Sequence, residues 1–180
     1  MLNSANNEIL TRVGPGTAMG GLFRQFWQPA LLCEELPAPD CPPVRVRLMG
    51  ENFVAFRDSS GKVGLLDAHC PHRLAELFFG RNEEGGLRCV YHGWKFSVTG
   101  ELLDMPSEPA GSPMRCNPNI RAKAYSVHEA GGIVWAYLGP QECVPPLPQM
   151  EFMSLPAQNF YTSKCLMKCN YQQALEGSID

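Results

Sequence analysis

The sequence lacks several features that would place it in a special class. No apolar run approaches the ~20 residues that a membrane span requires. Neither charge sign dominates, since 15 basic and 18 acidic residues leave a net charge of −3, so nothing favours nucleic acid or an anionic membrane surface as a partner. Asn3, Asn6 and Glu8 stand where a secretory signal needs an apolar core. The sequence therefore predicts a soluble, cytoplasmic protein with no nucleic-acid or membrane partner.

Histidine is scarce, with four residues, whereas cysteine is plentiful, with eight. Disulfides are not favoured, because no secretory signal accompanies the cysteines. Six cysteines have no histidine at ligand spacing and are expected to be reduced and mostly packed inside the fold. These six are Cys33, Cys41, Cys116, Cys143, Cys165 and Cys169.

The other two cysteines each have a histidine close by. Cys70 and His72 are separated by one residue, Cys89 and His92 by two, and 16 residues lie between the pairs. Two thiolates and two imidazoles suit a [2Fe–2S] centre of Rieske type, in which two His replace two Cys on one iron. By ligand type, the cysteines would hold one iron and the histidines the other. Gly93 follows His92 and permits backbone angles that a ligand loop needs.

Tetrahedral zinc is the alternative for this ligand set, because two Cys and two His also suit zinc. A zinc finger has at least two residues within each pair and its histidines close together, whereas each pair here mixes Cys with His. Zinc is the less favoured interpretation. Ordinary aromatic packing is expected of the neighbouring Tyr91 and Trp94, and the turn 105–109 is expected to cover the site.

Short strands separated by turn residues dominate the middle of the chain. Alternation of apolar and charged residues marks a half-buried strand at 44–48, and a hairpin partner follows at 53–56. Further strands are expected at 62–66, 87–90, 94–98, 102–103, 124–127 and 133–138. This pattern predicts a mainly β domain, a β-sandwich or small barrel.

The ends of the chain differ from this β region. Apolar residues recur at helical spacing over 18–28, and Pro29 would end that helix. Residues 141–158 are rich in proline and predict a stiff connector. A strand at 160–166 and a helix at 171–176 then suggest the start of a second domain.

Three stretches resemble the Rieske non-haem iron oxygenases, in particular the phthalate dioxygenase-like branch of aromatic ring-hydroxylating oxygenase large (α) subunits. They are DAHCPHR at 67–73, GRNEEGGLRCVYHGWKF at 80–96 and DMPSEP at 104–109. The resemblance implies three parts: a helix and Rieske domain at 1–140, a linker at 141–158, and the truncated start of an α/β helix-grip catalytic domain at 159–180.

The last stretch, YQQALEGSID at 171–180, is similar to the helix that opens the family's catalytic domain. The resemblance gives Asp180 the role of a bridge that carries electrons from a cluster-ligating His of one subunit to an iron-ligating His of the next. The role of Glu176 stays open. His69 and His128 have no suitable partners to replace the missing mononuclear-iron ligands.

For the full-length enzyme, the resemblance implies a flavin and iron–sulfur reductase as electron donor. It also implies mononuclear Fe(II), O2, an aromatic substrate and a homo-oligomer, a trimer or a multiple of one. Two other functions remain open: a free-standing Rieske ferredoxin that only carries electrons, and the zinc-binding structural module.

Overall fold

The computed structural model describes residues 2–179, without the side chains of Cys116 and Ala157. Its helices are α1 (Ser4–Thr11), α2 (Ala18–Phe23) and α3 (Tyr171–Ile179). Its strands are β1 (Trp27–Leu32), β2 (Val44–Leu48), β3 (Glu51–Arg57), β4 (Val63–Asp67), β5 (Arg81–Glu83), β6 (Gly86–Arg88), β7 (Lys95–Phe96), β8 (Leu102–Asp104), β9 (Ala124–Ala130) and β10 (Ile133–Tyr137). Short 3-10 turns are η1 (Cys33–Glu35), η2 (Leu77–Phe79), η3 (Pro113–Cys116), η4 (Gln141–Cys143), η5 (Glu151–Ser154) and η6 (Ala157–Asn159).

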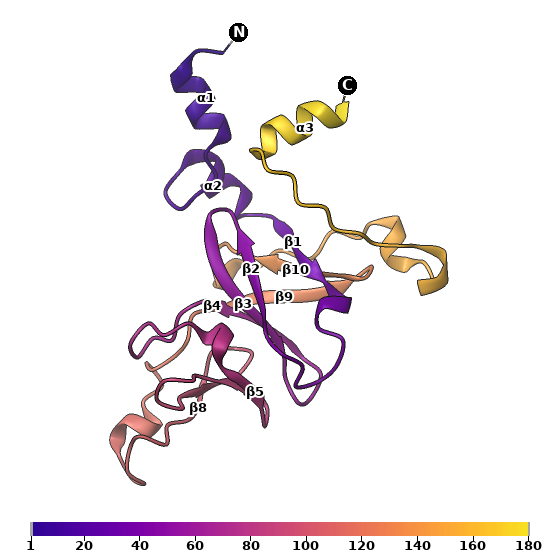
Figure 1. The fold of residues 1–180 in the computed structure, drawn as a ribbon. Coiled ribbons are helices and arrows are strands. Elements are labelled where there is room, and N and C mark those ends of the chain that lie inside the picture. The colour runs from indigo at the N-terminus through magenta and orange to yellow at the C-terminus, as the bar shows by residue number, and fades with distance from the viewer. Residues whose placement is uncertain (1, 180) are drawn as a thin grey trace.

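Two antiparallel sheets form the body of the molecule (Figure 1). The larger has six strands in the order β1-β10-β9-β4-β3-β2, and its edge strands β1 and β2 approach each other, so the sheet nearly closes into a barrel. The smaller has four strands in the order β5-β6-β7-β8. The mainly β fold predicted from the sequence is confirmed.

Strand β3 separates two apolar cores. Phe53 and Ala55 pack into the core within the barrel, whereas Val54 and Phe56 pack into a second core toward the small sheet. Successive side chains of a strand point to opposite faces, so a strand buried on both faces reads as an unbroken apolar run. The second core also contains Cys70 and Cys89, which places both predicted ligand thiols beside the barrel wall.

The helix predicted over 18–28 ends early. Helix α2 stops at Phe23, and Trp27 begins β1, where it pairs with Tyr137 of β10. Pro29 lies within that strand. An edge position tolerates its missing N–H, and the register shifts between Pro29 and Leu31.

The strand predicted at 160–166 is also wrong, because this segment is irregular and pairs with no described strand. It is nevertheless fastened to the barrel. Thr162 donates a hydrogen bond to the Gly131 carbonyl (3.0 Å), and Lys164 forms an ion pair with Glu35 (2.6 Å). A Cβ at Gly131 would clash with the Phe152 ring, so the turn and the connector are in close contact.

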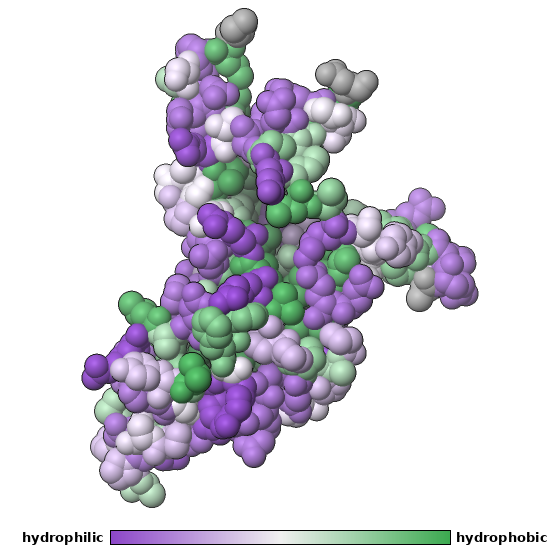
Figure 2. All heavy atoms as spheres, in the orientation of Figure 1, coloured by the Kyte–Doolittle hydropathy of each residue, from purple (hydrophilic) through white to green (hydrophobic). Residues whose placement is uncertain are grey.

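The helix predicted at 171–176 is confirmed as α3, and it lies beside α1 at the top of Figure 1. Within residues 2–179, no helix is both long and apolar enough to cross a bilayer. Large apolar residues interrupt the polar surface in places, as the green patches in Figure 2 show. The most exposed of them include Leu166, Leu74 and Val90.

Candidate metal centre

Two loops with the same backbone frame carry the four predicted ligands. In the first, the Cys70 N–H donates to the Ala75 carbonyl (2.8 Å), and the Leu74 N–H donates back to the Cys70 carbonyl (2.9 Å). In the second, Cys89 donates to Trp94 (2.8 Å) and Gly93 donates back to Cys89 (3.1 Å). Each cysteine therefore opens a loop that is closed by bonds to the fourth and fifth residues after it.

Both loops turn through a left-handed residue at the same place. Leu74 has φ +57° and Gly93 has φ +75°. Glycine enters this region without penalty, whereas a leucine there is strained. The histidines are offset by one residue between the two frames, since His72 is the second residue after its cysteine and His92 the third.

The two thiols lie together in the second core. Cys70 and Cys89 are 2% and 3% exposed. Burial, together with the adjacent Cys89 thiol, raises the pKa of the Cys70 thiol to about 11. Both thiols must lose their protons to bind metal, so metal binding here would release protons.

The two imidazoles also form a pair. The ring centroids of His72 and His92 are 4.7 Å apart. His92 Nδ1 is buried and has no hydrogen-bond partner among the described residues. An orphaned buried ring nitrogen is costly unless something binds it, so it is the position at which a missing metal fits.

The predicted ligands therefore form two pairs, a buried thiol pair and an imidazole pair. Among residues 2–179, no three His, Cys, Asp or Glu side chains converge as a group that suits one metal ion. Two thiols for one iron and two imidazoles for another match the donors of a Rieske [2Fe–2S] cluster. The residues present thus fit that group.

Aromatic side chains flank both histidines. The Trp94 ring is buried and stacks on His72, and the more exposed Tyr91 ring lies 3.8 Å from that of His92. Aromatic packing was predicted for Tyr91 and Trp94, and the structure shows that each packs against a histidine. Met105 is 1% exposed and belongs to the same core, as expected for the turn 105–109.

A charged network that the sequence analysis missed supports the second loop. Arg88 donates to the Gly93 carbonyl (2.8 Å), to Glu83 (2.6 Å) and to Asp104 (2.9 Å). Hydrogen bonding to Arg88 holds the pKa of the Asp104 carboxyl below its usual value. Arg115 completes the network at Asp104 (3.1 Å). The bonded partners are up to 16 residues apart in the chain, and periodicity carries no signal of such pairs.

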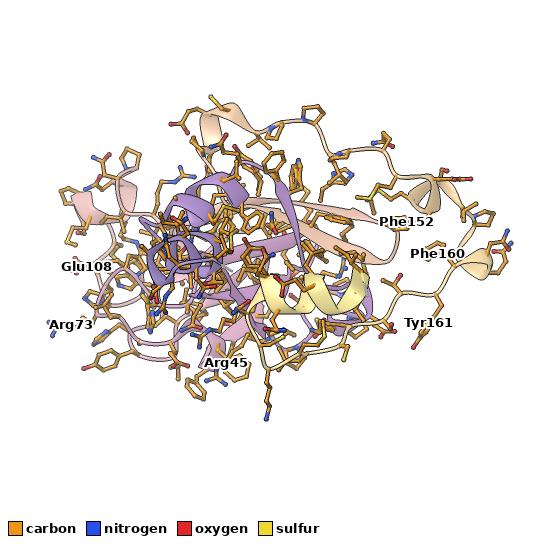
Figure 3. All side chains as sticks on the ribbon, turned by 90° about the horizontal axis from the view of Figure 1, so that it is seen from above. Arg45, Arg73, Glu108, Phe152, Phe160 and Tyr161 are labelled. Carbon is orange, nitrogen blue, oxygen red and sulfur yellow. The ribbon has the colours of Figure 1, made fainter. Side chains whose placement is uncertain are left out.

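The first loop is held from strand β2. Arg45 forms an ion pair with Glu76 (2.7 Å) and lies over the Phe78 ring, 3.7 Å from its centroid. Figure 3 labels Arg45, and it labels Arg73 and Glu108 at the left end of the molecule.

The remaining predicted residues lie outside this centre. Asp180 falls outside the described residues. Glu176 is exposed on α3, where Gln172 donates to it (3.3 Å), and His69 and His128 are exposed.

The six other cysteines divide by exposure. Cys33 and Cys41 are half-buried, as expected, but Cys143, Cys165 and Cys169 are exposed, so packing was the wrong prediction for these three. All three lie near or after the connector, beyond the two cores. The side chain of Cys116 is not among those described.

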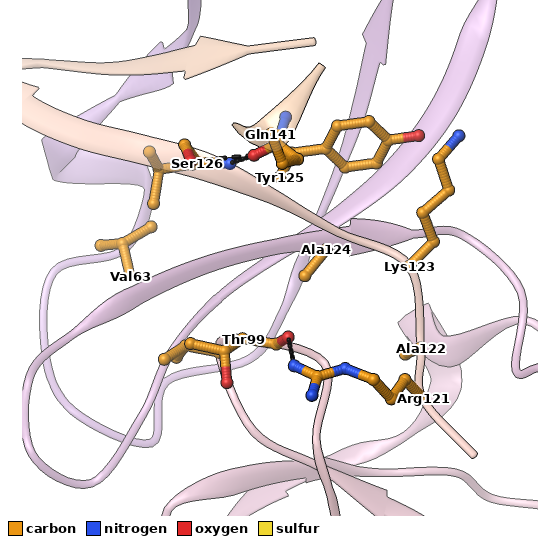
Figure 4. A pocket seen from close by; sticks show the side chains of 11 residues that line it. Val63, Thr99, Arg121, Ala122, Lys123, Ala124, Tyr125, Ser126 and Gln141 are labelled. Atoms are coloured by element: carbon orange, nitrogen blue, oxygen red, sulfur yellow. Dashed lines mark hydrogen bonds between the residues drawn. The ribbon is translucent and has the colours of Figure 1, made fainter. Parts of the chain in front are cut away.

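A hollow of about 600 Å³ lies elsewhere (Figure 4). It is an open groove lined from β4, β9 and neighbouring loops, with Thr99, Arg121 and Lys123 on its walls. Its lining does not include the four candidate ligands.

Comparison with known proteins shows the family of the chain. A family model described as "Rieske [2Fe-2S] domain" matches residues 26–126. The chain belongs to this family. The matched range includes both ligand loops and β1 to the start of β9.

Curated relatives are similar over the whole chain. It is 50% identical to the 3-chlorobenzoate-3,4-dioxygenase oxygenase subunit of Comamonas testosteroni, covering 100% of this chain and 41% of the relative. It is 45% identical to the phthalate 4,5-dioxygenase oxygenase subunit of Pseudomonas putida, again over 100% of this chain and 40% of the relative. The chain thus spans about two fifths of the length of these relatives.

Solved structures of oxygenases are also similar to this chain. Dicamba monooxygenase with non-heme iron and dicamba superposes with a TM-score of 0.61 at 28% identity, over 71% of this chain and 38% of that one. The oxygenase in an oxygenase–ferredoxin complex of carbazole 1,9a-dioxygenase also gives 0.61 at 28% identity, over 77% and 33%.

Proposed function

We propose that this chain is the electron-transfer part of a Rieske non-haem iron oxygenase that hydroxylates aromatic compounds. Cys70 and Cys89 would hold one iron of a [2Fe–2S] cluster, and His72 and His92 the other. The observation that carries this proposal is the pair of equivalent loops, which bring two buried thiols and two imidazoles together and leave His92 Nδ1 without a partner. When bound, such a cluster accepts and passes on single electrons at a potential of roughly −150 to +300 mV.

The chain's own residues supply the setting for that chemistry. The Arg88 network fixes the second loop through the Gly93 carbonyl, and Met105 closes the core behind the ligands. The exposed edge lies on the histidine side, because His72 is half-buried whereas both thiols are buried. An electron donor would therefore approach the histidines.

The wider enzyme is inferred from the relatives. A subunit of their length would add a catalytic domain with mononuclear Fe(II), where O2 and an aromatic substrate react, and Asp180 would carry electrons toward that iron. A reductase with flavin and a second iron–sulfur centre would be the donor. The seven free cysteines among the described residues fit a reducing compartment such as the cytoplasm.

A homo-oligomer is favoured by where the parts of this chain lie. The small sheet and its ligand loops occupy the lower part of Figure 1, whereas α3 lies at the top, beside α1. Helix α3 is thus remote from the cluster loops of its own copy. Transfer through Asp180 would run to a neighbouring copy.

Iron and sulfide analysis tests the cluster. The chain purified without oxygen should contain two iron and two acid-labile sulfide, and Cys89→Ser should abolish the visible colour. Cys143→Ser is the matched control, because that thiol is exposed and remote from both loops. Stoichiometric zinc without sulfide would instead support the zinc-binding module. A free-standing ferredoxin carrier would be supported if a gene for this protein encoded no catalytic domain after Asp180.

A further inference from the structure

The Trp94 side chain connects the two ligand loops. Trp94 closes the second loop, yet its ring stacks on His72 of the first, with centroids 4.3 Å apart and planes inclined by 3°. Trp94 is 5% exposed, so its ring is fixed in the second core while its face is presented to His72. Parallel aromatic rings at this separation attract each other beyond the area they bury.

The stack can fix the orientation of the His72 ring, a role that a hydrogen bond usually fills. A metal-bound histidine usually donates its second ring N–H to a carboxylate, a carbonyl or water, and that bond fixes the ring. The side-chain hydrogen bonds of the described residues include none to the His72 ring. Rotation about the bond that joins an imidazole to its Cβ is soft, and the parallel indole face restricts that rotation.

The indole ring is itself held from the turn 105–109. Its N–H donates to the Ser107 hydroxyl at 3.3 Å. The turn lies directly against the second loop, since a Cβ on Gly93 would meet Pro106 Cγ at 2.6 Å. Arg115 fixes the turn by donating to two of its carbonyls, those of Met105 (2.9 Å) and Glu108 (2.8 Å).

We propose that Trp94 is a positioning residue that sets the orientation of the His72 ring, and that Ser107 acts on His72 through Trp94. The proposal rests on the proposed function, because it takes His72 as a ligand of the cluster. The electronic properties of an iron–sulfur cluster depend on its ligands and on the contacts that orient them. Loosening the His72 ring therefore changes the spectrum and the potential, whereas a packing role alone changes stability.

Three variants of the 180-residue chain separate these roles. Trp94→Leu removes the flat ring, Trp94→Phe keeps a ring but loses the N–H, and Ser107→Ala removes only the acceptor. Trp135→Phe is the matched control. This indole is also buried and also donates one hydrogen bond, to the Ala130 carbonyl (3.1 Å), but it belongs to the six-stranded sheet.

Iron and sulfide are measured first in the unchanged chain, and their absence would refute the proposed function rather than this inference. In cluster-loaded protein we then measure the g values of the reduced state, the reduction potential and the apparent unfolding temperature. Trp94→Leu should shift the g values and the potential most. Trp94→Phe and Ser107→Ala should give smaller shifts of the same sign, and Trp135→Phe should leave both unchanged even where it lowers stability.

A double variant tests the route through Trp94. Ser107→Ala should shift the potential in the unchanged chain but add nothing in the Trp94→Leu background, because the two residues act in series. Equal effects of Ser107→Ala in both backgrounds would overturn the route. If Trp94→Leu does not fold, Trp94→Phe and Ser107→Ala still decide: spectra and potentials like those of Trp135→Phe would overturn the proposal.

Discussion

Leu74 has a backbone conformation that is unfavourable for a leucine, and it lies in the first candidate ligand loop. It has φ +57° and its side chain is 72% exposed, so it is strained and gains little from burial. Gly93 holds the equivalent place in the second loop without that strain. The backbone of the first loop is therefore slightly strained beside the candidate metal centre.

Relieving this strain should stabilise the protein. Leu74→Gly removes a left-handed penalty of about 1–2 kcal/mol, offset in part by the entropy that glycine loses, for a net gain of roughly 0.5–1 kcal/mol. We expect the apparent unfolding temperature of the loaded chain to rise by about 1–4 °C at a fixed scan rate. Leu155→Gly is the control, since Leu155 is also exposed but has φ −74°, and it should not raise that temperature.

The reactivity of the single residue Cys33 should depend on pH in an unusual way. Burial, with the nearby Glu129 carboxylate, raises the pKa of its thiol to about 11 from an ordinary value near 9. The neutral thiol therefore favours the fold at neutral pH, and its contribution is lost as pH rises from about 9 through 11. At pH 8 its alkylation should be about a hundredfold slower than that of a thiol with the ordinary pKa near 9, because the thiolate is the reactive form. The exposed Cys143 is the comparison thiol.

Peptide mapping after timed alkylation from pH 7 to 11 measures this difference. Glu129→Gln should speed the labelling of Cys33, whereas Glu34→Gln should not, because Glu34 is exposed and does not act on this thiol. Equal rates for Cys33 and Cys143 at pH 8 would contradict the raised pKa.

At the scale of elements, helix α3 is anchored to the N-terminal helices by one residue. The Tyr171 hydroxyl donates to the Leu10 carbonyl of α1 at 2.6 Å, and its ring packs edge-on against Phe23 of α2 at 4.9 Å. The carbonyls of the last turn of a helix lack partners within that helix, so Tyr171 supplies one to α1. The N-terminal helices thus help to place α3.

Tyr171→Phe should loosen α3 while preserving the ring contact. Loss of the hydrogen bond costs about 1 kcal/mol, which corresponds to roughly fivefold faster amide exchange in residues 171–179 when exchange follows local opening. Tyr161→Phe is the control, because Tyr161 is 89% exposed. The same acceleration in both variants would show that the bond to Leu10 does not hold the helix.

Comparison of these elements shows what a sequence pattern can predict. The strands between 44 and 66 were correctly predicted because alternation and turn residues are local signals. The four candidate ligands could be named because their spacing is short, and their role stays a prediction. Trp27 was misassigned, since its pairing with Tyr137 joins residues 110 positions apart and overrides the helical pattern. The segment 160–166 has strand-like residues but no described strand beside it. The Arg88 network, the Trp94 stack and the Tyr171 anchor depend on tertiary contacts alone.

At the scale of the whole molecule, the separation of the ligand loops from α3 predicts complementation between copies. In the full-length oligomer, Cys89→Ser would lose the cluster and Asp180→Asn would lose the bridge, so each variant alone should be nearly inactive. Assembled together, one copy would supply a cluster and its neighbour an intact Asp180. Random mixing in equal amounts should restore about a quarter of the activity, because one junction in four combines the two intact parts.

Turnover of the co-expressed mixture is compared with that of the two variants combined after separate assembly, which should stay inactive until subunits exchange. Activity of Asp180→Asn alone at the unchanged level would exclude the bridge. No recovery in verified mixed oligomers would place the electron path within a single copy.

The fastening of the connector to the barrel has a practical consequence for producing this domain. Thr162 and Lys164 bind the turn at Gly131 and the residues around Glu35, and Phe152 rests on the same turn. A shorter chain that ends in the proline-rich segment would lose these contacts with the turn. The apolar surface exposed there would then favour aggregation. The shortest soluble version for spectroscopy should therefore extend to at least residue 165. The proline-rich segment before it holds these contacts in place and should not be the site of truncation.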